Sequence, residues 1–519
     1  MDAVTTPPLP VNEPTRGFAP GSAERASLEA RIKELAGEQV ELTSTIAGVQ
    51  RMAGGDTYEV VQPHRHAAVL GTSANATDAD VRDAVDAALA AGPAWRALAF
   101  DERAAVLLRA AELLSGPWRD TLNAATVLGQ SKSCYQADID AAAEFIDFLR
   151  FNVHFGRQIL AEQPQSSPGV WNRLDHRPLE GFVLAITPFN FTAIAGNLPL
   201  APALMGNTVV WKPSPTQQLA AHHTMRLLEA AGLPPGVINL VTGDGRAVSS
   251  VALTHRQLAG VHFTGSTATF QKLWSTVGSN LDQYAGYPRL VGETGGKDFV
   301  IAHPSADPDA LVTGLVRGAF EYQGQKCSAA SRAYLPRSLW EGGLRDQLVQ
   351  TTETVEYGDV TDLSVFGGAV IDRRAYDRLS GVLGRLKESA EVLTGGTADD
   401  SVGYFVKPTV AVSTDPEHEI FTTEYFGPIL GVLVYDDADW SSMLAQAADV
   451  APYALTGSVF ATDRYALAEA DAALRFSAGN FYVNDKPTGA VVGQQPFGGA
   501  RASGTNDKAG SILNLLRWV

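Results

Sequence analysis

The sequence predicts an α/β protein in which a doubly wound nucleotide-binding domain precedes a second α/β domain. Between residues 181 and 301, short apolar segments alternate with helical ones, which is typical of a parallel sheet covered by helices. A second alternating region spans about 300–480. The length of 519 residues leaves room for about three domains of roughly 150 residues each. We expect the active site in the cleft between the two α/β domains.

Helices dominate the first part of the chain. Residues 1–55 combine Pro-rich segments with a short amphipathic stretch at 24–37. Apolar residues then recur at three- and four-residue spacing. This spacing predicts helices at 78–98, 101–116 and 135–155.

The strands of the nucleotide-binding domain follow. Segments rich in Val, Ile and Leu predict buried parallel strands at 181–186, 207–213, 236–243 and 258–265. The stretches between them predict helices at 193–206, 216–232 and around 244–253.

The charge balance excludes some classes of partner. The chain has 40 basic and 57 acidic residues and a net charge of −17, whereas nucleic-acid binding needs clustered Lys and Arg. It has neither a secretory or mitochondrial targeting pattern at its N-terminus nor an apolar run of about 20 residues. We therefore expect a cytoplasmic protein with no nucleic-acid or membrane partner.

Two residues indicate covalent chemistry on a carbonyl group. Cys327 lies in GQKCS, and Glu293 lies in the Gly-rich GETGGK. A thiolate can add to an aldehyde, and a carboxylate can activate the water that hydrolyses the resulting thioester. A buried free cysteine near a surface acid is the alternative. Cys134 is the only other cysteine, so no disulfide framework is expected, and we interpret it as a packed thiol.

The Gly-rich motifs differ in what they indicate. Gly243 and Gly245 follow a strand, but Val248 occupies the place of the third glycine of a dinucleotide fingerprint, so a plain turn is favoured. GETGGK continues to Asp298, where a P-loop needs Ser or Thr, so ATP binding is not expected. The segment 263–266 closes a strand and opens a helix, which favours it as the cofactor contact.

Six motifs together resemble the aldehyde dehydrogenase superfamily in order and spacing: ITPFNF, VVWKPS, HFTGS, GETGGK, GQKCS and EYFGP. The stretches 143–152, 189–207 and 480–510 resemble its Δ1-pyrroline-5-carboxylate dehydrogenase branch. The resemblance implies an aldehyde dehydrogenase-like fold. It also implies that NAD oxidises L-glutamate γ-semialdehyde to L-glutamate, the last step of proline degradation.

The resemblance assigns roles to individual residues. Cys327 is similar to the nucleophile, Glu293 to the general base, and Asn190 to the amide of the oxyanion hole. The cofactor residues that the resemblance implies are Thr187, Pro188, Phe189, Lys212, Ser214, Gly265, Ser266, Glu424 and Phe426. No metal is implied.

The resemblance also implies a site for the amino-acid end of the substrate. Lys326 is expected to bind the carboxylate, and as a neighbour of Cys327 it is also expected to favour the thiolate. Glu144 is expected to meet the ammonium group, although such a residue is more often an exposed helix acid. The implied substrate residues are Glu144, Phe191, Lys326, Ser328, Gly489, Ala490 and Phe497.

The chain departs from its relatives at three places. Pro215 stands where many superfamily members have a Glu that bonds the adenosine 2′-hydroxyl, so weaker discrimination against NADP is expected. Ala490 replaces a Ser of some relatives. The resemblance implies a further C-terminal strand, which pairs with a neighbouring subunit, beyond Trp518 and Val519.

The resemblance divides the chain into three parts. Residues 1–162 and 181–297 form the NAD-binding domain, 298–485 form the catalytic domain, and 163–180 with 486–519 form an oligomerisation element. A homo-oligomer and functional coupling to a proline dehydrogenase are implied.

Two other functions are compatible with the residues. A CoA-acylating enzyme, or one with a different aldehyde as substrate, would share the nucleophile, although CoA chemistry needs no base such as Glu293. A non-catalytic protein could retain the fold, although Cys327, Asn190 and Glu293 are all present.

Overall fold

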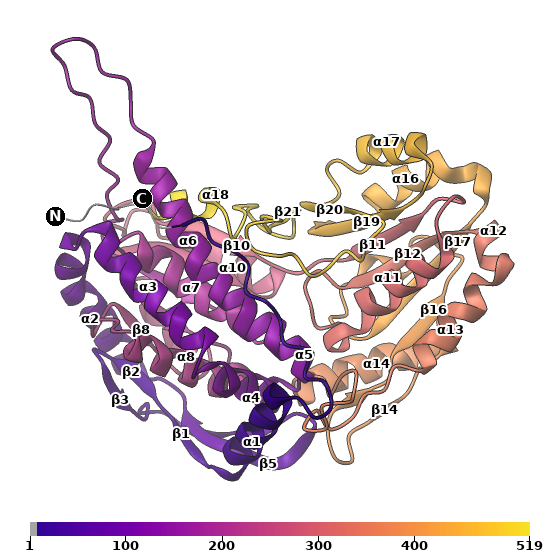
Figure 1. The fold of residues 1–519 in the computed structure, drawn as a ribbon, viewed down its shortest axis with the longest axis horizontal. Coiled ribbons are helices and arrows are strands. Elements are labelled where there is room, and N and C mark those ends of the chain that lie inside the picture. The colour runs from indigo at the N-terminus through magenta and orange to yellow at the C-terminus, as the bar shows by residue number, and fades with distance from the viewer. Residues whose placement is uncertain (1–7) are drawn as a thin grey trace.

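Two large, mostly parallel sheets form the two halves of the protein (Figure 1). The computed structural model describes residues 8–519. The expectation of no targeting pattern at the N-terminus falls partly on residues 1–7, which lie outside the described residues. The first half is built mainly from the chain before residue 294, and the second half mainly from residues 298–483.

The first sheet is doubly wound, as predicted. From edge to edge its strands are β10 (Arg289–Glu293), β9 (Leu258–Thr264), β6 (Phe182–Ile186), β7 (Thr208–Lys212), β8 (Ile238–Leu240), β2 (Ser44–Ile46) and β3 (Val49–Arg51). The five strands from β10 to β8 are parallel. The chain winds from β6 toward β8 in one direction and through β9 to β10 in the other. The switch in direction therefore lies between β6 and β9, where open α/β sheets bind ligands.

Alternating residues of the central strands pack into two separate hydrophobic cores, one on each face of the sheet. Val183 and Ala185 of β6 pack into one core, and Phe182 and Leu184 pack into the other, because successive side chains of a strand point to opposite faces. One face is covered by α3 (Phe100–Ser115), α6 (Glu144–Ala161), α7 (Thr192–Leu204) and α8 (Gln218–Ala230). The other is covered by α2 (Asp78–Ala97), α9 (Arg246–Val251) and α10 (Thr267–Ser279). The helices predicted around 78–98, 101–116 and 135–155 are confirmed.

The N-terminal region contributes more structure than its sequence predicted. The amphipathic stretch forms α1 (Ala23–Gly37), which packs with α4 (Arg119–Gln130). A three-stranded sheet joins β1 (Val40–Leu42), β5 (Arg65–Ala74) and β4 (Thr57–Gln62). Strands β2 and β3 were not predicted, because β2 is short and depends on pairing with the distant β8.

The second sheet is parallel except for one edge strand. Its strands, in spatial order, are β13 (Glu391–Thr394), β16 (Thr409–Val412), β17 (Ile429–Tyr435), β12 (Ala330–Pro336), β11 (Asp298–Ala302), β19 (Thr456–Phe460) and β20 (Asn480–Val483). Only β13 runs antiparallel to its neighbour. The main helices beside it are α11 (Pro308–Phe320), α13 (Arg345–Glu353), α14 (Arg373–Ser389), α16 (Trp440–Asp449) and α17 (Arg464–Ala473).

Two segments lie outside this two-sheet plan. The loop 163–180 extends away from the body between α6 and β6 (Figure 1). The chain after β20 returns to the first half, where α18 (Ile512–Leu515) packs beside α6. The buried Trp518 ring lies 4.7 Å from that of His262. None of the helices in residues 8–519 has the length and apolar character needed to span a bilayer.

Candidate active site

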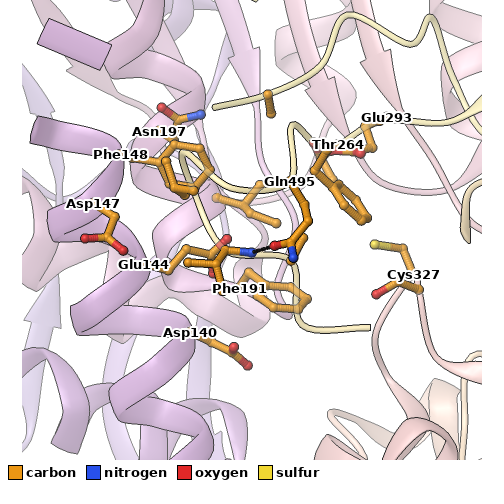
Figure 2. Close-up of a pocket in the computed structure, with 18 of the residues that line it drawn as sticks. Asp140, Glu144, Asp147, Phe148, Phe191, Asn197, Thr264, Glu293, Cys327 and Gln495 are labelled. Carbon is orange, nitrogen blue, oxygen red and sulfur yellow. Dashed lines mark hydrogen bonds between the residues drawn. The ribbon is translucent and has the colours of Figure 1, made fainter. Parts of the chain in front are cut away.

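A cavity of about 280 Å³ lies between the two sheets. Most residues that the sequence proposed for catalysis and substrate binding line it: Glu144, Phe191, Glu293, Lys326, Cys327, Ser328, Gly489, Ala490 and Phe497. Cys327 and Glu293 are at one side, and Glu144 projects from α6 at the other (Figure 2). The two chemical groups and the expected amino-acid site therefore share one space.

A constrained turn holds Cys327. The short turn η3 (Glu321–Gly324) follows α11, and its Tyr322 and Gln323 have left-handed φ values of 49° and 53°. Residues other than glycine adopt this conformation only when their surroundings hold it. The Tyr322 hydroxyl donates to the Gln130 carbonyl at 3.0 Å, and the Gln323 amide donates to the Ala369 carbonyl at 2.7 Å. These contacts fix the loop that carries the thiol.

The Cys327 thiol is protonated at rest. Its side chain is buried, and burial raises the pKa of the thiol well above 9.0, with the Glu293, Asp298 and Glu424 carboxyl groups adding to the shift. A buried thiol near carboxylates favours its neutral form. The expectation that Lys326 favours the thiolate is wrong, so addition to a carbonyl requires a base that removes the proton.

The orientation of Lys326 explains that error. Its Nζ donates to Gln136 Oε1 at 2.5 Å and to Glu321 Oε2 at 3.4 Å, and it lies 4.0 Å from Asp140 Oδ2. These acidic partners raise the pKa of Lys326 although burial lowers it. The ammonium is thus bound on the side of the cavity wall where Asp140 lies, and it remains charged.

Glu144 belongs to the same charged cluster. It follows Asp140 by four residues and lines the cavity, so the alternative of an exposed helix acid is wrong. Burial, together with the Asp140 carboxylate, raises the pKa of Glu144 well above its usual range. Lys132 Nζ binds Asp140 Oδ2 at 2.5 Å and lies 4.3 Å from the centre of the Phe191 ring. The cavity wall therefore presents both signs of charge.

Glu293 ends β10 and faces the cavity. Burial raises the pKa of its carboxyl group to about 8, although Lys508 opposes the shift. Within residues 8–519 its Oε1 is buried without a hydrogen-bond partner. Lys508 is held by its own bonds to the Gly479 and Gly498 carbonyls at 2.8 and 2.9 Å. Glu293 thus has an oxygen free to bind water and a pKa suited to proton transfer.

Asn190 reaches the loop of the thiol from the first sheet. Its side chain is buried, and Nδ2 donates to the Gln325 carbonyl at 2.9 Å. The amide therefore lies beside the backbone that leads to Cys327. Its action as an oxyanion donor is a proposal that this position supports.

The loop after β20 contains most of the remaining residues that are expected to bind the substrate. The hydroxyl groups of Ser328 and Thr488 are hydrogen-bonded at 2.8 Å, which joins the thiol's segment to this loop. Gly489 has a φ of 94°, a conformation that favours glycine. Phe497 exchanges backbone hydrogen bonds with Ala509 at 3.0 and 2.8 Å, so its ring is held at the cavity wall.

The predicted cofactor residues of the first sheet gather at its switch point. Thr187, Pro188 and Phe189 follow β6, and Gly265 and Ser266 follow the neighbouring β9. Ser266 caps α10 by accepting a hydrogen bond from the Thr269 N–H at 3.2 Å. A helix N-terminus at a switch point is suited to a pyrophosphate group.

Lys212 and Ser214 lie at the end of the next strand. Lys212 is buried and forms no ion pair within the described chain, and burial lowers its pKa to about 8 against the pull of Asp244. An ammonium without a carboxylate contact can donate to ligand hydroxyl groups. The Ser214 and Thr216 hydroxyl groups bond each other at 3.0 Å. Pro215 between them begins the turn η2 (Pro215–Gln217).

The second half contributes Glu424 and Phe426. Glu424 Oε1 accepts from the Gly296 N–H at 3.0 Å, and burial raises the pKa of Glu424 to about 7. A Cβ at Gly295 would lie 2.1 Å from the same oxygen, so glycine keeps the space for this carboxyl group. Phe426 packs edge-on against Phe189 at 5.9 Å. The residues present therefore fit a dinucleotide that extends from the first sheet toward the thiol.

Sequence reasoning missed the partners of Lys326. Gln136 and Asp140 precede the predicted Glu144 at four-residue spacing, which in a helix places the three residues on one face. That signal was available. No local pattern signals Lys508 or Asn12, because Lys508 acts on Glu293 and Asn12 contacts Val492, both far away along the chain.

Comparisons with known proteins agree with this geometry. The model of the aldehyde dehydrogenase family matches residues 50–517. A crystal structure of the Δ1-pyrroline-5-carboxylate dehydrogenase from Mycobacterium tuberculosis bound with NAD is 62% identical, with a TM-score of 0.96, and the match covers 100% of this chain and 96% of that chain. The mitochondrial Δ1-pyrroline-5-carboxylate dehydrogenase of Homo sapiens is 46% identical over 98% of this chain and 90% of its own length.

A longer protein also contains this fold. Proline utilization A from Bdellovibrio bacteriovorus is 29% identical, with a TM-score of 0.91, over 99% of this chain and 53% of that chain. The fold, the site and the full-length matches agree. The chain therefore belongs to the aldehyde dehydrogenase family and, within it, to the branch of the Δ1-pyrroline-5-carboxylate dehydrogenases.

Proposed function

We propose that this protein oxidises L-glutamate γ-semialdehyde, the open form of Δ1-pyrroline-5-carboxylate, to L-glutamate with NAD. The observation that carries the proposal is the shared cavity, in which a buried thiol and carboxyl group are at one side and opposite charges at the other. An ω-aldehyde of an amino acid has the matching groups at its two ends.

Binding begins at the charged end. Lys326 is the partner of the α-carboxylate, and Glu144 is the partner of the α-ammonium group. The backbone at Gly489 and Ala490 adds donors, and Phe191 and Phe497 enclose the carbon chain. A charge-assisted hydrogen bond is worth about 1.5–3 kcal/mol, so this anchor fixes the aldehyde near the thiol.

Cys327 then transfers its proton to solvent water, and the resulting thiolate sulfur bonds to the aldehyde carbon. The carbonyl π electrons move to oxygen, which becomes an alkoxide. The Asn190 amide and the Cys327 backbone N–H are the proposed donors to this oxygen. One such aimed donor contributes about 3 kcal/mol to transition-state stability.

Oxidation and hydrolysis follow. NAD, when bound, accepts the hydride that leaves the thiohemiacetal carbon, and the carbon–oxygen double bond forms again as a thioester of Cys327. Glu293 takes a proton from water, which attacks this thioester and displaces the Cys327 sulfur. Lys212, Ser266 and Glu424 are the residues placed to hold the dinucleotide.

A panel of substrates tests this function. Purified protein is given glutamate semialdehyde, succinate semialdehyde or a simple aldehyde, with NAD or NADP, with and without CoA. We expect NADH and L-glutamate in equal amounts, without CoA, and the highest kcat/KM for glutamate semialdehyde. A requirement for CoA, or preference for an aldehyde without the amino-acid group, would contradict the proposal.

We also propose a homo-oligomer formed through residues 163–180 and 486–519. The loop 163–180 exposes 81% of Trp171, together with Val170 and Leu174, away from the body. Exposed apolar groups of this kind are typical of an interface. Light scattering on a chromatographed sample should give a mass above the 55.0 kDa of one chain, and deletion of residues 166–174 should lower it.

We also propose a cytoplasmic location and functional coupling to a proline-oxidising enzyme. Both cysteines are free thiols, which suits a reducing compartment such as the cytoplasm, and cell fractionation tests this. The match to about half of a proline utilization protein supports functional coupling to a proline-oxidising enzyme. Co-purification or transfer kinetics with such an enzyme tests the coupling.

A further inference from the structure

The N-terminal segment 9–18 forms part of the cavity wall. It crosses the helices of the first half in an extended conformation (Figure 1), and Asn12, Glu13 and Thr15 line the cavity. Both oxygens of Glu13 are bound, one by Arg119 at 2.7 Å and the other by Arg150 at 2.8 Å. Phe18 is 3% exposed in the core beneath α1. The segment is thus fixed on both sides of Asn12.

Asn12 joins α6 to the loop 489–495. Its Nδ2 donates to Asp147 Oδ2 at 2.8 Å and to the Val492 carbonyl at 2.7 Å. Its Oδ1 accepts from Gln494 Nε2 at 2.9 Å. Every polar atom of this side chain is therefore used to connect two walls of the cavity.

The two hydrogen bonds from Asn12 to Val492 and Gln494 fix the middle of the loop 489–495. Within residues 8–519, the hydrogen bonds from 489–495 to other segments are the two made by Asn12. The loop's remaining bonds are internal, such as that from the Val491 N–H to Gln495 Oε1 at 2.8 Å. Gly489 and Gly493 have positive φ values of 94° and 82°, which favour glycine, and the Val492 side chain packs in the core of the first half.

Asp147 completes the connection. It follows Glu144 by one helical turn and also points to the cavity (Figure 2). Its Oδ1 accepts from the Glu13 N–H at 2.7 Å, while Asn12 holds Oδ2. The segment thereby occupies both oxygens of a carboxylate that would otherwise compete with Glu144 for the substrate's ammonium group.

We propose that Asn12 is a positioning residue for substrate selection, which holds the loop 489–495 so that the Gly489–Ala490 backbone meets the amino-acid end of the substrate. This inference rests on the proposed function. It predicts that the loop loses its fixed position, and the enzyme its preference for an amino-acid aldehyde, when the Asn12 side chain is removed.

The test compares Asn12→Ala with the matched control Val11→Ala, whose side chain is 78% exposed on the same segment. For Asn12→Ala, KM for glutamate semialdehyde should rise about tenfold, because the variant loses both hydrogen bonds from Asn12 to the loop. Its kcat at saturation, and kcat/KM for a simple aldehyde, should stay within about twofold. Asn12→Asp, which places a second carboxylate beside Asp147, should raise KM further. Val11→Ala should match the wild type.

Hydrogen exchange of the NAD-bound enzyme gives a second readout. Peptides covering 489–495 should exchange faster in Asn12→Ala, and those of β6 should not. An unchanged KM, an equal loss with both aldehydes, or unchanged exchange in the loop would overturn the inference. If the wild type does not oxidise glutamate semialdehyde, the proposed function is wrong, and the exchange result alone decides whether Asn12 positions the loop.

Discussion

The ammonium group of Lys326 turns away from the adjacent Cys327 and donates to Gln136 Oε1 at 2.5 Å. Sequence neighbours thus serve opposite ends of one cavity. Cys327 lines the cavity on the side of Glu293, whereas Lys326 joins a cluster with Asp140 and Glu321. A lysine beside a thiol would by itself suggest activation of the nucleophile, and the geometry instead supports recognition of the substrate.

Lys326→Ala should therefore change selectivity. Loss of one charge-assisted bond to the carboxylate should lower kcat/KM for glutamate semialdehyde by about 10- to 150-fold, or ~1.5–3 kcal/mol. The kcat/KM for a simple aldehyde of similar length should fall little, because the Lys326 ammonium binds Gln136 and Glu321 at the other end of the cavity. Steady-state kinetics with both substrates measures this. Equal losses would show that Lys326 acts on the thiol or on the fold.

Cys327→Ala should abolish dehydrogenase activity and leave NAD affinity nearly unchanged. The thiol forms the covalent bond, while the proposed cofactor residues belong to other segments. Activity assays with a parallel NAD titration by calorimetry measure both effects. Cys134→Ala is the matched control, since Cys134 is buried beside the Leu363 carbonyl and does not line the cavity. NADH formation by Cys327→Ala above background would rule out the nucleophile.

The hydrolysis step should depend on pH through Glu293. Its pKa is raised to about 8, so below that pH most molecules hold the protonated form, which cannot accept a proton from water. The steady-state rate limited by thioester hydrolysis should rise about tenfold per pH unit up to about pH 8 and then level off. The initial NADH burst reports the earlier steps and serves as the control. A flat steady-state profile from pH 6 to 9 would contradict the role of Glu293.

Pro215→Glu should widen the preference for NAD over NADP. A carboxylate at this position would accept from the adenosine 2′-hydroxyl and repel a 2′-phosphate. Pro215 also begins the turn η2, so its replacement can loosen the local backbone and weaken the binding of both cofactors. The ratio of the two kcat/KM values is therefore the quantity to measure, with Pro215→Gln as the uncharged control. A ratio that stays the same or falls would place the discrimination elsewhere.

The sequence predicted the elements whose signals are local. The run around Val183 and Leu184 has the composition of a buried strand, and Ser266 after β9 has the pattern of a helix cap. The doubly wound sheet follows from the alternation of such elements. β2 was missed because its stability comes from pairing with β8, almost 200 residues away.

The site could be predicted where a sequence motif fixes the backbone. It could not be predicted where the contacts of a side chain depend on the packing of distant segments. Cys327 and Glu293 stand in Gly-rich turns, and the structure brings both to one cavity. The direction of Lys326 depends on Gln136 and Asp140. Only the tertiary contacts between the turn η3 and the first half bring these residues near. Asn12 contacts Val492 across 480 positions of the chain, and no local pattern signals such a contact.

The central claim is that Cys327 carries the substrate's acyl group until Glu293 directs water to it. Glu293→Gln should complete hydride transfer and stall, so one burst of NADH, at most one equivalent per site, precedes slow turnover. Intact-mass and peptide analysis of the stalled enzyme, given glutamate semialdehyde and NAD, should find a glutamyl thioester on Cys327 and none on Cys134. A full burst of NADH with no adduct on Cys327, or with the adduct on another residue, would contradict the account.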